Sequence, residues 1–257
     1  MVFFDKHLIN IIRSNFENDP QKILDIGCGD GRLLKIFSNI FKNSDLIGQE
    51  VVDSETKIRF IDPETSESHY WSQSLNTNKE KNYDSIESTT KDKKIQIIQN
   101  NINNDWPIDD NSIDVITSNM VLEHVQDLDL FARNMNRVMS KNSLAIHIVP
   151  TTSSLWEGHI KQPLSHRIKS EKWINFCYSL GFGIRSDRSS AEWSRMFKEE
   201  FYYRPESQLN SALSSKREYD FAMLALRVFN KNFYNLKLKL PFSNIFIPST
   251  LITRKTK

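Results

Sequence analysis

An apolar run that stops at three alternating glycines is the feature that most limits the fold of this chain. Residues 23–31 read Ile-Leu-Asp-Ile-Gly-Cys-Gly-Asp-Gly. The first four have the content of a buried parallel strand. Apolar residues at helical spacing follow directly, at Leu33, Leu34, Phe37, Ile40 and Phe41. A strand, a glycine turn and a helix in this order bring the backbone close to a nucleotide-like ligand.

The spacing of the glycines and the charges beside them indicate which ligand the turn binds. A dinucleotide-binding turn reads Gly-x-Gly-x-x-Gly, whereas Arg32 stands here in place of the last glycine. Asp25 and Asp30 flank the turn, and two carboxylates would repel a pyrophosphate. They suit a ligand with cationic groups and no phosphate. S-adenosylmethionine, with its α-amino group and sulfonium, fits that description, and a nicotinamide-dependent oxidoreductase is the disfavoured rival.

Three further segments follow in a consistent order. Glu50 comes after the apolar run 46–48, close to the roughly 20-residue offset from the glycines at which an acid meets a ribose hydroxyl. A third run, 95–98, leads into Asn100-Asn101-Ile102. A fourth, 115–117, leads into Ser-Asn-Met-Val-Leu-Glu-His-Val at 118–125.

With these motifs in order, residues 21–152 resemble the class I S-adenosylmethionine-dependent methyltransferases. The closest pattern is the branch that reads Leu-Asp-x-Gly-Cys-Gly-x-Gly and later Val-Leu-Glu-His-Val. The resemblance implies an α/β, Rossmann-like open seven-stranded sheet with helices on both faces, its last strand antiparallel, and the cofactor at the carboxyl ends of the strands. The cofactor-binding residues that it implies are Asp25, Gly27, Cys28, Gly29, Gly31, Glu50, Asn101, Ile102, Asn119 and Met120.

The resemblance also suggests roles for some of these side chains. Glu50 is expected to accept hydrogen bonds from both ribose hydroxyls, with Asp53 as the weaker alternative. Asn101 would accept a hydrogen bond from the adenine amino group, while a plain turn role after the strand stays open. Asp25 would order water and the methionine amino group, and it can also cap the turn.

The segment 156–167, after a predicted strand at 144–149, is too polar for a core and is expected to face the methyl acceptor. His159 and His166 are the catalytic candidates, because a histidine with a pKa near ~6.5 can take a proton from a hydroxyl. A role in capping the loop stays open for both. Their spacing fits no short metal motif, so no metal is predicted. His124 is expected to support the start of a helix.

Length and composition limit the organisation of the chain. One methyltransferase domain is predicted over the 257 residues, with an N-terminal helix in 1–20, a cofactor-binding core in 21–152 and an acceptor-side region in 153–257. The polar insertion 53–94 reads as a mobile excursion, and a helical insertion is expected at 190–240. Two cysteines exclude a disulfide framework. No leader peptide or membrane span is evident, so a cytoplasmic protein is expected.

These features predict O-methylation of a small molecule or a glycan. A non-catalytic S-adenosylmethionine-binding module is the alternative. The formal charge of +2 and the absence of a basic stripe disfavour nucleic acid as a partner. Peripheral contact with a membrane stays open, and the sequence leaves the oligomeric state undetermined.

Overall fold

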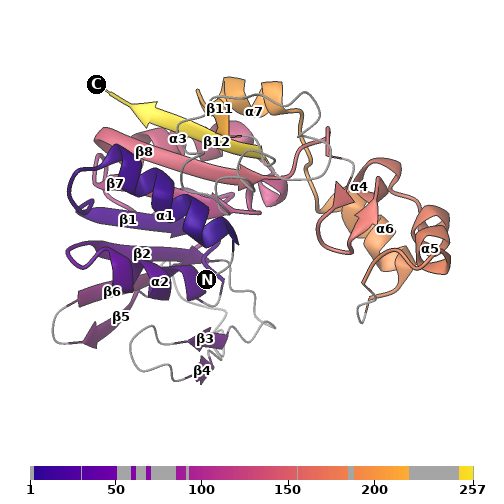
Figure 1. The fold of residues 1–257 in the computed structure, drawn as a ribbon, viewed down its shortest axis with the longest axis horizontal. Coiled ribbons are helices and arrows are strands. Elements are labelled where there is room, and N and C mark those ends of the chain that lie inside the picture. The colour runs from indigo at the N-terminus through magenta and orange to yellow at the C-terminus, as the bar shows by residue number, and fades with distance from the viewer. Residues whose placement is uncertain are drawn as a thin grey trace, which may run out of the picture. The chain divides into compact units, whose positions relative to one another are not determined.

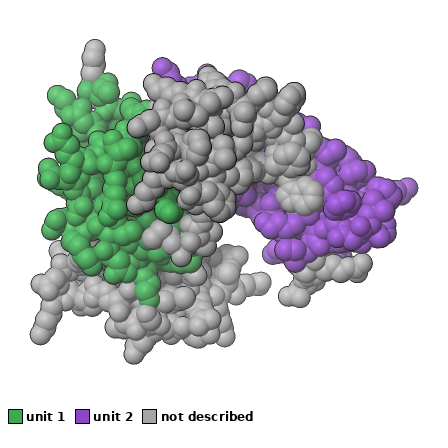
Figure 2. Space-filling view, in the orientation of Figure 1, with its two compact units in different colours: residues 1–119, 127–146, 254–257 green, residues 120–126, 147–253 purple. Residues whose placement is uncertain are grey.

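The computed structural model describes residues 3–29, 31–50, 59–61, 68–70, 85–90, 93–154, 156–184, 188–219 and 249–256 (Figure 1). The chain divides into two compact units, which Figure 2 colours separately. The first consists of residues 1–119, 127–146 and 254–257, and the second of residues 120–126 and 147–253.

Within the described residues, the main sheet has eight strands in the order β11-β12-β8-β7-β1-β2-β6-β5. Its central strands are parallel: β1 (Lys22–Ile26) pairs with β7 (Ile113–Asn119) and with β2 (Asp45–Glu50), and β2 pairs with β6 (Lys93–Gln99). All four lie where continuous apolar runs predicted buried strands.

The remaining strands of this sheet are β5 (Ser85–Thr90), β8 (Met139–Val149), β11 (Lys216–Tyr219) and β12 (Ser249–Lys255). Strand β5 is antiparallel to β6, and β11 is antiparallel to β12. The last strand of the chain is therefore antiparallel to its neighbour, as predicted. The predicted Rossmann-like α/β fold class is confirmed, and β5 adds an eighth strand at the edge of the predicted seven-stranded sheet.

The register of the parallel strands brings their carboxyl ends to one edge. Ile26 is aligned with Gln49 of β2 and with Ser118 of β7. The residues that end or follow these strands therefore come together, among them Gly27, Glu50 and Asn119. This is the edge at which open parallel sheets bind ligands.

Three helices of the first unit match the amphipathic patterns in the sequence: α1 (Phe3–Asn15), α2 (Arg32–Ile40) and α3 (Leu128–Val138). Asp127 caps α3, since its Oδ1 accepts a hydrogen bond from the Leu130 N–H at 2.8 Å. Arg32 donates to both carboxylate oxygens of the buried Asp5. The residue that replaces the expected third glycine thus joins the start of α2 to α1.

Gly48 of β2 supplies the close packing that a third glycine would otherwise give. A Cβ at this position would lie 2.7 Å from Cys28 Sγ and from Leu34 Cδ1, and 2.8 Å from Ile97 Cδ1. The absence of a side chain on the strand therefore lets the glycine turn and α2 approach the sheet.

We expect Gly48→Ala to lower the free energy of unfolding by about 1–3 kcal/mol, because the added methyl overfills this contact. Urea unfolding measures the change. The cost should shrink in a Cys28→Ala background, where one of the three clashing atoms is gone. A Gly48→Ala protein more stable than the wild type, as glycine replacements in open space can be, would contradict the packing role.

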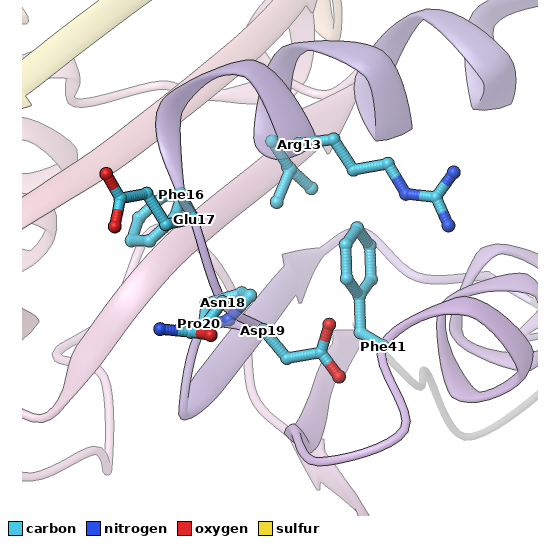
Figure 3. A pocket seen from close by; sticks show the side chains of 8 residues that line it. Arg13, Phe16, Glu17, Asn18, Asp19, Pro20 and Phe41 are labelled. Atoms are coloured by element: carbon cyan, nitrogen blue, oxygen red, sulfur yellow. The ribbon is translucent and has the colours of Figure 1, made fainter.

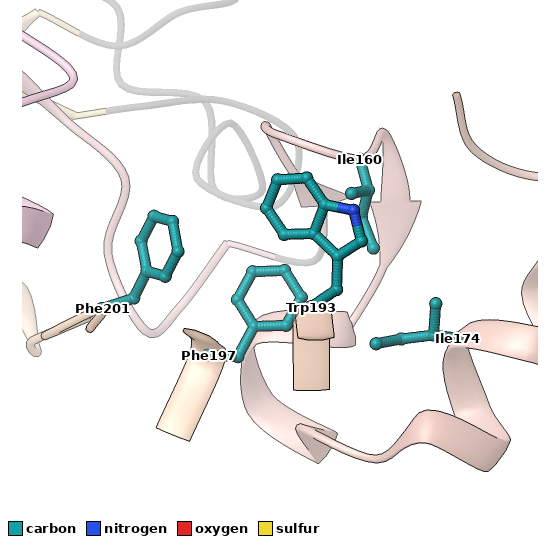
Figure 4. Close-up of a cluster of buried hydrophobic side chains, with 5 residues drawn as sticks. All are labelled: Ile160, Ile174, Trp193, Phe197 and Phe201. Carbon is teal, nitrogen blue, oxygen red and sulfur yellow. The ribbon is translucent and has the colours of Figure 1, made fainter. Parts of the chain in front are cut away.

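The second unit has a core of its own. Its elements are η1 (Leu122–His124), β9 (Trp156–Glu157), β10 (Gln162–Pro163), α4 (Ser165–Ile168), α5 (Glu171–Ser179), α6 (Ser190–Glu199) and α7 (Glu206–Ala212). Figure 4 shows the buried cluster that α5, α6 and the turn after β9 enclose, formed by Ile160, Ile174, Trp193, Phe197 and Phe201.

The helical insertion predicted at 190–240 is only partly helical in its described part. The two helices α6 and α7 are separate, and an extended segment that ends at Pro205 divides them. Residues 216–219 form β11 because β12 pairs with them. Residues 220–248, which include the rest of the predicted helical insertion, lie outside the described residues.

Parts of the polar insertion 53–94 also form strands. Besides β5, a small antiparallel sheet joins β3 (Arg59–Ile61) to β4 (Ser68–Tyr70). The remainder of the insertion, with Asp53, lies outside the described residues. None of the helices in the described part of the chain has the length and hydrophobicity of a transmembrane span.

Candidate functional site

The glycine turn at the tip of β1 is built to approach a ligand. Gly27, Gly29 and Gly31 all have φ in the left-handed region, at 67°, 54° and 73°. The N–H groups of Gly27 and Cys28 donate to the Gln49 carbonyl at 2.7 and 3.2 Å, which fixes the turn to β2. A Cβ at Gly29 would meet no atom of the described residues within 4 Å, so the space beside this residue is open.

Glu50 lies against this turn. Its Oε2 accepts a hydrogen bond from the Gly29 N–H at 2.7 Å. A carboxylate has about four acceptor positions, so one such group can accept several hydrogen bonds. The predicted acid therefore lies beside the predicted turn.

Asp25 is a buried acid behind the turn, with 3% of its surface exposed. Its Oδ1 accepts a hydrogen bond from Thr117 Oγ1 at 2.7 Å, across the β1–β7 pair. Burial raises the pKa of Asp25 to about 7; the Thr117 hydrogen bond opposes this shift, and the charge of Glu50 adds to it. A cationic group close to the turn would favour the ionised carboxylate.

The structure gives Asn101 the turn role that the sequence left open. Its Oδ1 accepts a hydrogen bond from the Asn103 N–H at 2.9 Å, while the side chain stays exposed. An amide oxygen has a second acceptor position, so an adenine amino group can still bind there. Ile102 beside it is buried.

Asn119 ends β7 at the same edge. Its Oδ1 is buried and accepts no hydrogen bond from the residues that the structure describes. A buried acceptor without a donor is costly, which makes this atom suited to a ligand N–H or O–H. The next residue, Met120, begins the second unit with φ at 59°, and its N–H donates to the Ile148 carbonyl at 2.8 Å.

The residues of the first unit fit an adenosyl cofactor. They offer a carboxylate at the turn, an exposed amide oxygen at Asn101, a buried amide oxygen without a donor at Asn119, and open space beside Gly29. These groups accept hydrogen bonds from hydroxyl and amino groups. The buried Asp25 and the carboxylate of Glu50 also disfavour a phosphate there.

A cavity of about 310 Å³ lies elsewhere in the first unit (Figure 3). The end of α1, residues 16–20 and Phe41 line it. These residues precede β1 or follow α2, so the cavity is at the amino end of β1. The glycine turn is at the carboxyl end of that strand, and the predicted cofactor residues do not line this cavity.

In the second unit, Glu157 organises the candidate acceptor segment. It is buried and accepts hydrogen bonds from His159 Nδ1 at 2.6 Å, the His159 N–H at 2.9 Å, the Ile160 N–H at 2.7 Å and Tyr203 Oη at 2.9 Å. Burial alone would raise its pKa, but the hydrogen bond and charge of His159 and the two N–H groups outweigh burial and lower it. No pattern in the sequence indicated this role for Glu157.

The structure separates the two catalytic candidates by environment. The His159 side chain is 24% exposed and is held through Nδ1 by Glu157. His166 is 2% exposed, and its ring lies 4.8 Å from that of Tyr203. Burial lowers the pKa of His166 to about 4, although the charge of Glu157 opposes the shift.

Glu123 and His124 of η1 come close to His159. One potential ligand atom from each of the three lies within 4.8 Å of the others. Phe201 packs against both imidazoles, with ring centroids at 4.8 Å from His124 and 4.6 Å from His159. The sequence placed Glu123 in a motif and His124 at the start of a helix, and no spacing rule joins either residue to His159.

A model of a methyltransferase domain matches residues 6–225. No curated protein matches the sequence. Several solved structures share the fold. The plantazolicin methyltransferase BpumL, in complex with a substrate analogue and S-adenosylhomocysteine, has 13% identity and a TM-score of 0.54, over 99% of this chain and 84% of that one.

Two further structures are similar at the same level. An S-adenosylmethionine-dependent methyltransferase from Mesorhizobium loti has 10% identity and a TM-score of 0.51, over 95% of this chain and 96% of that one. Geranyl diphosphate C-methyltransferase from Streptomyces coelicolor has 10% identity and a TM-score of 0.51, over 98% and 77%. The family match spans most of the chain, so this protein belongs to the methyltransferase-domain family and is a class I S-adenosylmethionine-dependent methyltransferase.

Proposed function

We propose that this enzyme transfers a methyl group from S-adenosylmethionine to a hydroxyl oxygen of a small molecule or a glycan. The observation that carries the proposal is the carboxylate of Glu50 beside the open glycine turn, bonded to the Gly29 N–H at 2.7 Å. In this position Glu50 binds the ribose hydroxyls. Asn101 and Asn119 bind amino groups of the cofactor, and Asp25 provides a negative charge behind the turn.

The bound cofactor supplies a methyl carbon that is already activated by its positively charged sulfur. The protein therefore has two tasks. Holding the acceptor in line with the carbon–sulfur bond contributes roughly 7–11 kcal/mol. Removal of the acceptor proton by a base adds about 10²–10⁴-fold for a weakly nucleophilic hydroxyl.

Of the two predicted bases, we propose that His159 accepts the proton from the acceptor hydroxyl. Its Nδ1 is occupied by Glu157, which leaves Nε2 for the acceptor. Nε2 would accept the hydroxyl proton when the bound cofactor supplies the methyl group to the acceptor oxygen. His166 is too buried for contact with an acceptor, and its lowered pKa makes it a weak base.

Methyl-deuterated S-adenosylmethionine added with the protein to fractionated cell extract tests this proposal. We expect one labelled methyl group on an oxygen of a compound in the metabolite or glycan fraction, found by mass spectrometry, and much less label with Glu50→Gln at the same low cofactor concentration. Label on nitrogen, on carbon or in the nucleic-acid fraction contradicts the proposed acceptor. Binding of S-adenosylhomocysteine without transfer in any fraction supports a non-catalytic binding module instead.

A further inference from the structure

We infer that Glu123, His124 and His159 form a binding site for one first-row divalent metal ion of the zinc type. The three side chains bring one carboxylate and two imidazoles together, with ligand atoms within 4.8 Å of one another. Imidazole donors suit zinc, iron, cobalt, nickel and copper, whereas magnesium and calcium prefer oxygen-only sites. The donor set therefore selects the class of ion.

The state of Glu123 points independently to a ligand. Only 1% of its surface is exposed, and neither carboxylate oxygen has a hydrogen-bond partner among the described residues. A buried carboxylate without partners is costly. A cation satisfies both oxygens. The rival is a proton, since burial raises the pKa of Glu123 to about 7, with the charge of His159 opposing the shift.

The surroundings of His159 match those of a metal-bound histidine. Its Nδ1 bonds to Glu157 at 2.6 Å, and Tyr203 Oη lies 3.3 Å from the same nitrogen and donates to Glu157 at 2.9 Å. Histidines that bind metals usually donate their other N–H to a carboxylate, which fixes the tautomer and the ring orientation. This arrangement leaves Nε2 as the nitrogen available to an ion.

The segment 202–204 connects the two ligand-bearing segments, because Tyr203 bonds to Glu157 and its two neighbours bond to η1. The Tyr202 N–H donates to the Glu123 carbonyl at 2.6 Å. Arg204 donates to the carbonyls of Leu122 at 3.3 Å and Val125 at 2.7 Å, on either side of η1. A tetrahedral ion with bonds of ~2.0–2.1 Å needs ligand atoms about 3.4 Å apart. Binding therefore requires side-chain rotations that move these atoms on the order of 1 Å.

Three protein ligands leave at least one position open to an oxygen. Resting on the proposed function, this position takes the acceptor hydroxyl. With the ion bound, it would lower the pKa of that hydroxyl. The proton would then leave to solvent water, because Nε2 of His159 would be a ligand and could not also accept it. Binding of the ion itself does not depend on the reaction.

Calorimetric titration of the tag-free, EDTA-dialysed full chain with Zn²⁺ tests the inference. We expect one equivalent to bind, and atomic-emission analysis after dialysis should find about one zinc per chain. Glu123→Gln and His124→Ala should weaken binding about 100-fold. Glu157→Gln should weaken it 10–100-fold, the range seen when a partner of a metal-bound histidine is removed. Glu199→Gln, an exposed carboxylate of α6 in the same unit, is the matched control.

His124 is exposed, so His124→Ala keeps the test valid if Glu123→Gln disturbs the buried core. Absence of zinc uptake by the wild type overturns the inference and leaves Glu123 as a protonated buried acid. Zinc affinity equal in His124→Ala, Glu123→Gln and Glu199→Gln overturns it as well. Titration of the zinc-free protein with S-adenosylhomocysteine separates the two proposals, because a failure there bears on the cofactor site and not on the metal site.

Discussion

Relative to the wild type, Asp25→Asn is expected to gain about 3 kcal/mol in unfolding free energy as the pH rises from 5 to 8. Burial is the main cause that raises the pKa of Asp25 in the folded chain to about 7, from 3.8 for an unperturbed aspartate. Each unit of such a shift is worth 1.36 kcal/mol. The effect is large because the carboxylate is almost fully buried beside two other acids, Glu50 and Asp5.

The direction of this change in stability with pH depends on whether the folded or the unfolded chain holds the proton. Between about pH 4 and pH 7 the folded chain keeps a proton on Asp25 that the unfolded chain has lost, so stability falls as the pH rises. The contribution is complete below pH 4 and is lost as the pH rises through 7. Asparagine carries no such proton, while its amide oxygen can still accept the Thr117 hydrogen bond.

Urea unfolding followed by circular dichroism at pH 5, 6, 7 and 8 measures the difference between the two proteins. Asp129→Asn, at an exposed position in the first turn of α3, is the matched control. Parallel stability profiles for the wild type and Asp25→Asn would show that Asp25 is ionised in the folded chain throughout this range. The raised pKa would then be wrong.

The strands and helices of the first unit were predictable because their patterns are local. Buried parallel strands read as continuous apolar runs, which located β1, β2, β6 and β7. Helical patterns located α1 and α2. The glycine turn and Glu50 could be connected from sequence because the offset between them is characteristic of such folds.

The errors and omissions arise where distant segments decide the structure. The residues of β11 read Lys-Arg-Glu-Tyr, with no alternation of apolar residues, and they form a strand because β12 pairs with them. Gly48 looks like any glycine within a strand, and its role depends on contacts with Cys28, Leu34 and Ile97. For the same reason the sequence did not bring Glu123 and His159 together, since they are neighbours only after folding.

Glu50→Gln is expected to lower the affinity for S-adenosylhomocysteine about 100-fold, a loss of about 3 kcal/mol. Hydrogen bonds to a charged group contribute about 1.5–3 kcal/mol each, and the proposed site uses this carboxylate for two hydroxyls. The glutamine oxygen can still accept the Gly29 N–H bond, so the turn keeps its geometry. The substitution therefore removes the charge and one acceptor without removing the contact that holds the turn.

Calorimetric titration of the wild type, Glu50→Gln and Glu17→Gln provides a matched test. Glu17 is an exposed acid that lines the 310 Å³ cavity at the amino end of β1. If the cofactor binds over the glycine turn, Glu17→Gln retains wild-type affinity and only Glu50→Gln loses it. The reverse pattern would place the cofactor in that cavity, and the turn, with its three left-handed glycines and the carboxylate beside it, would then need another explanation.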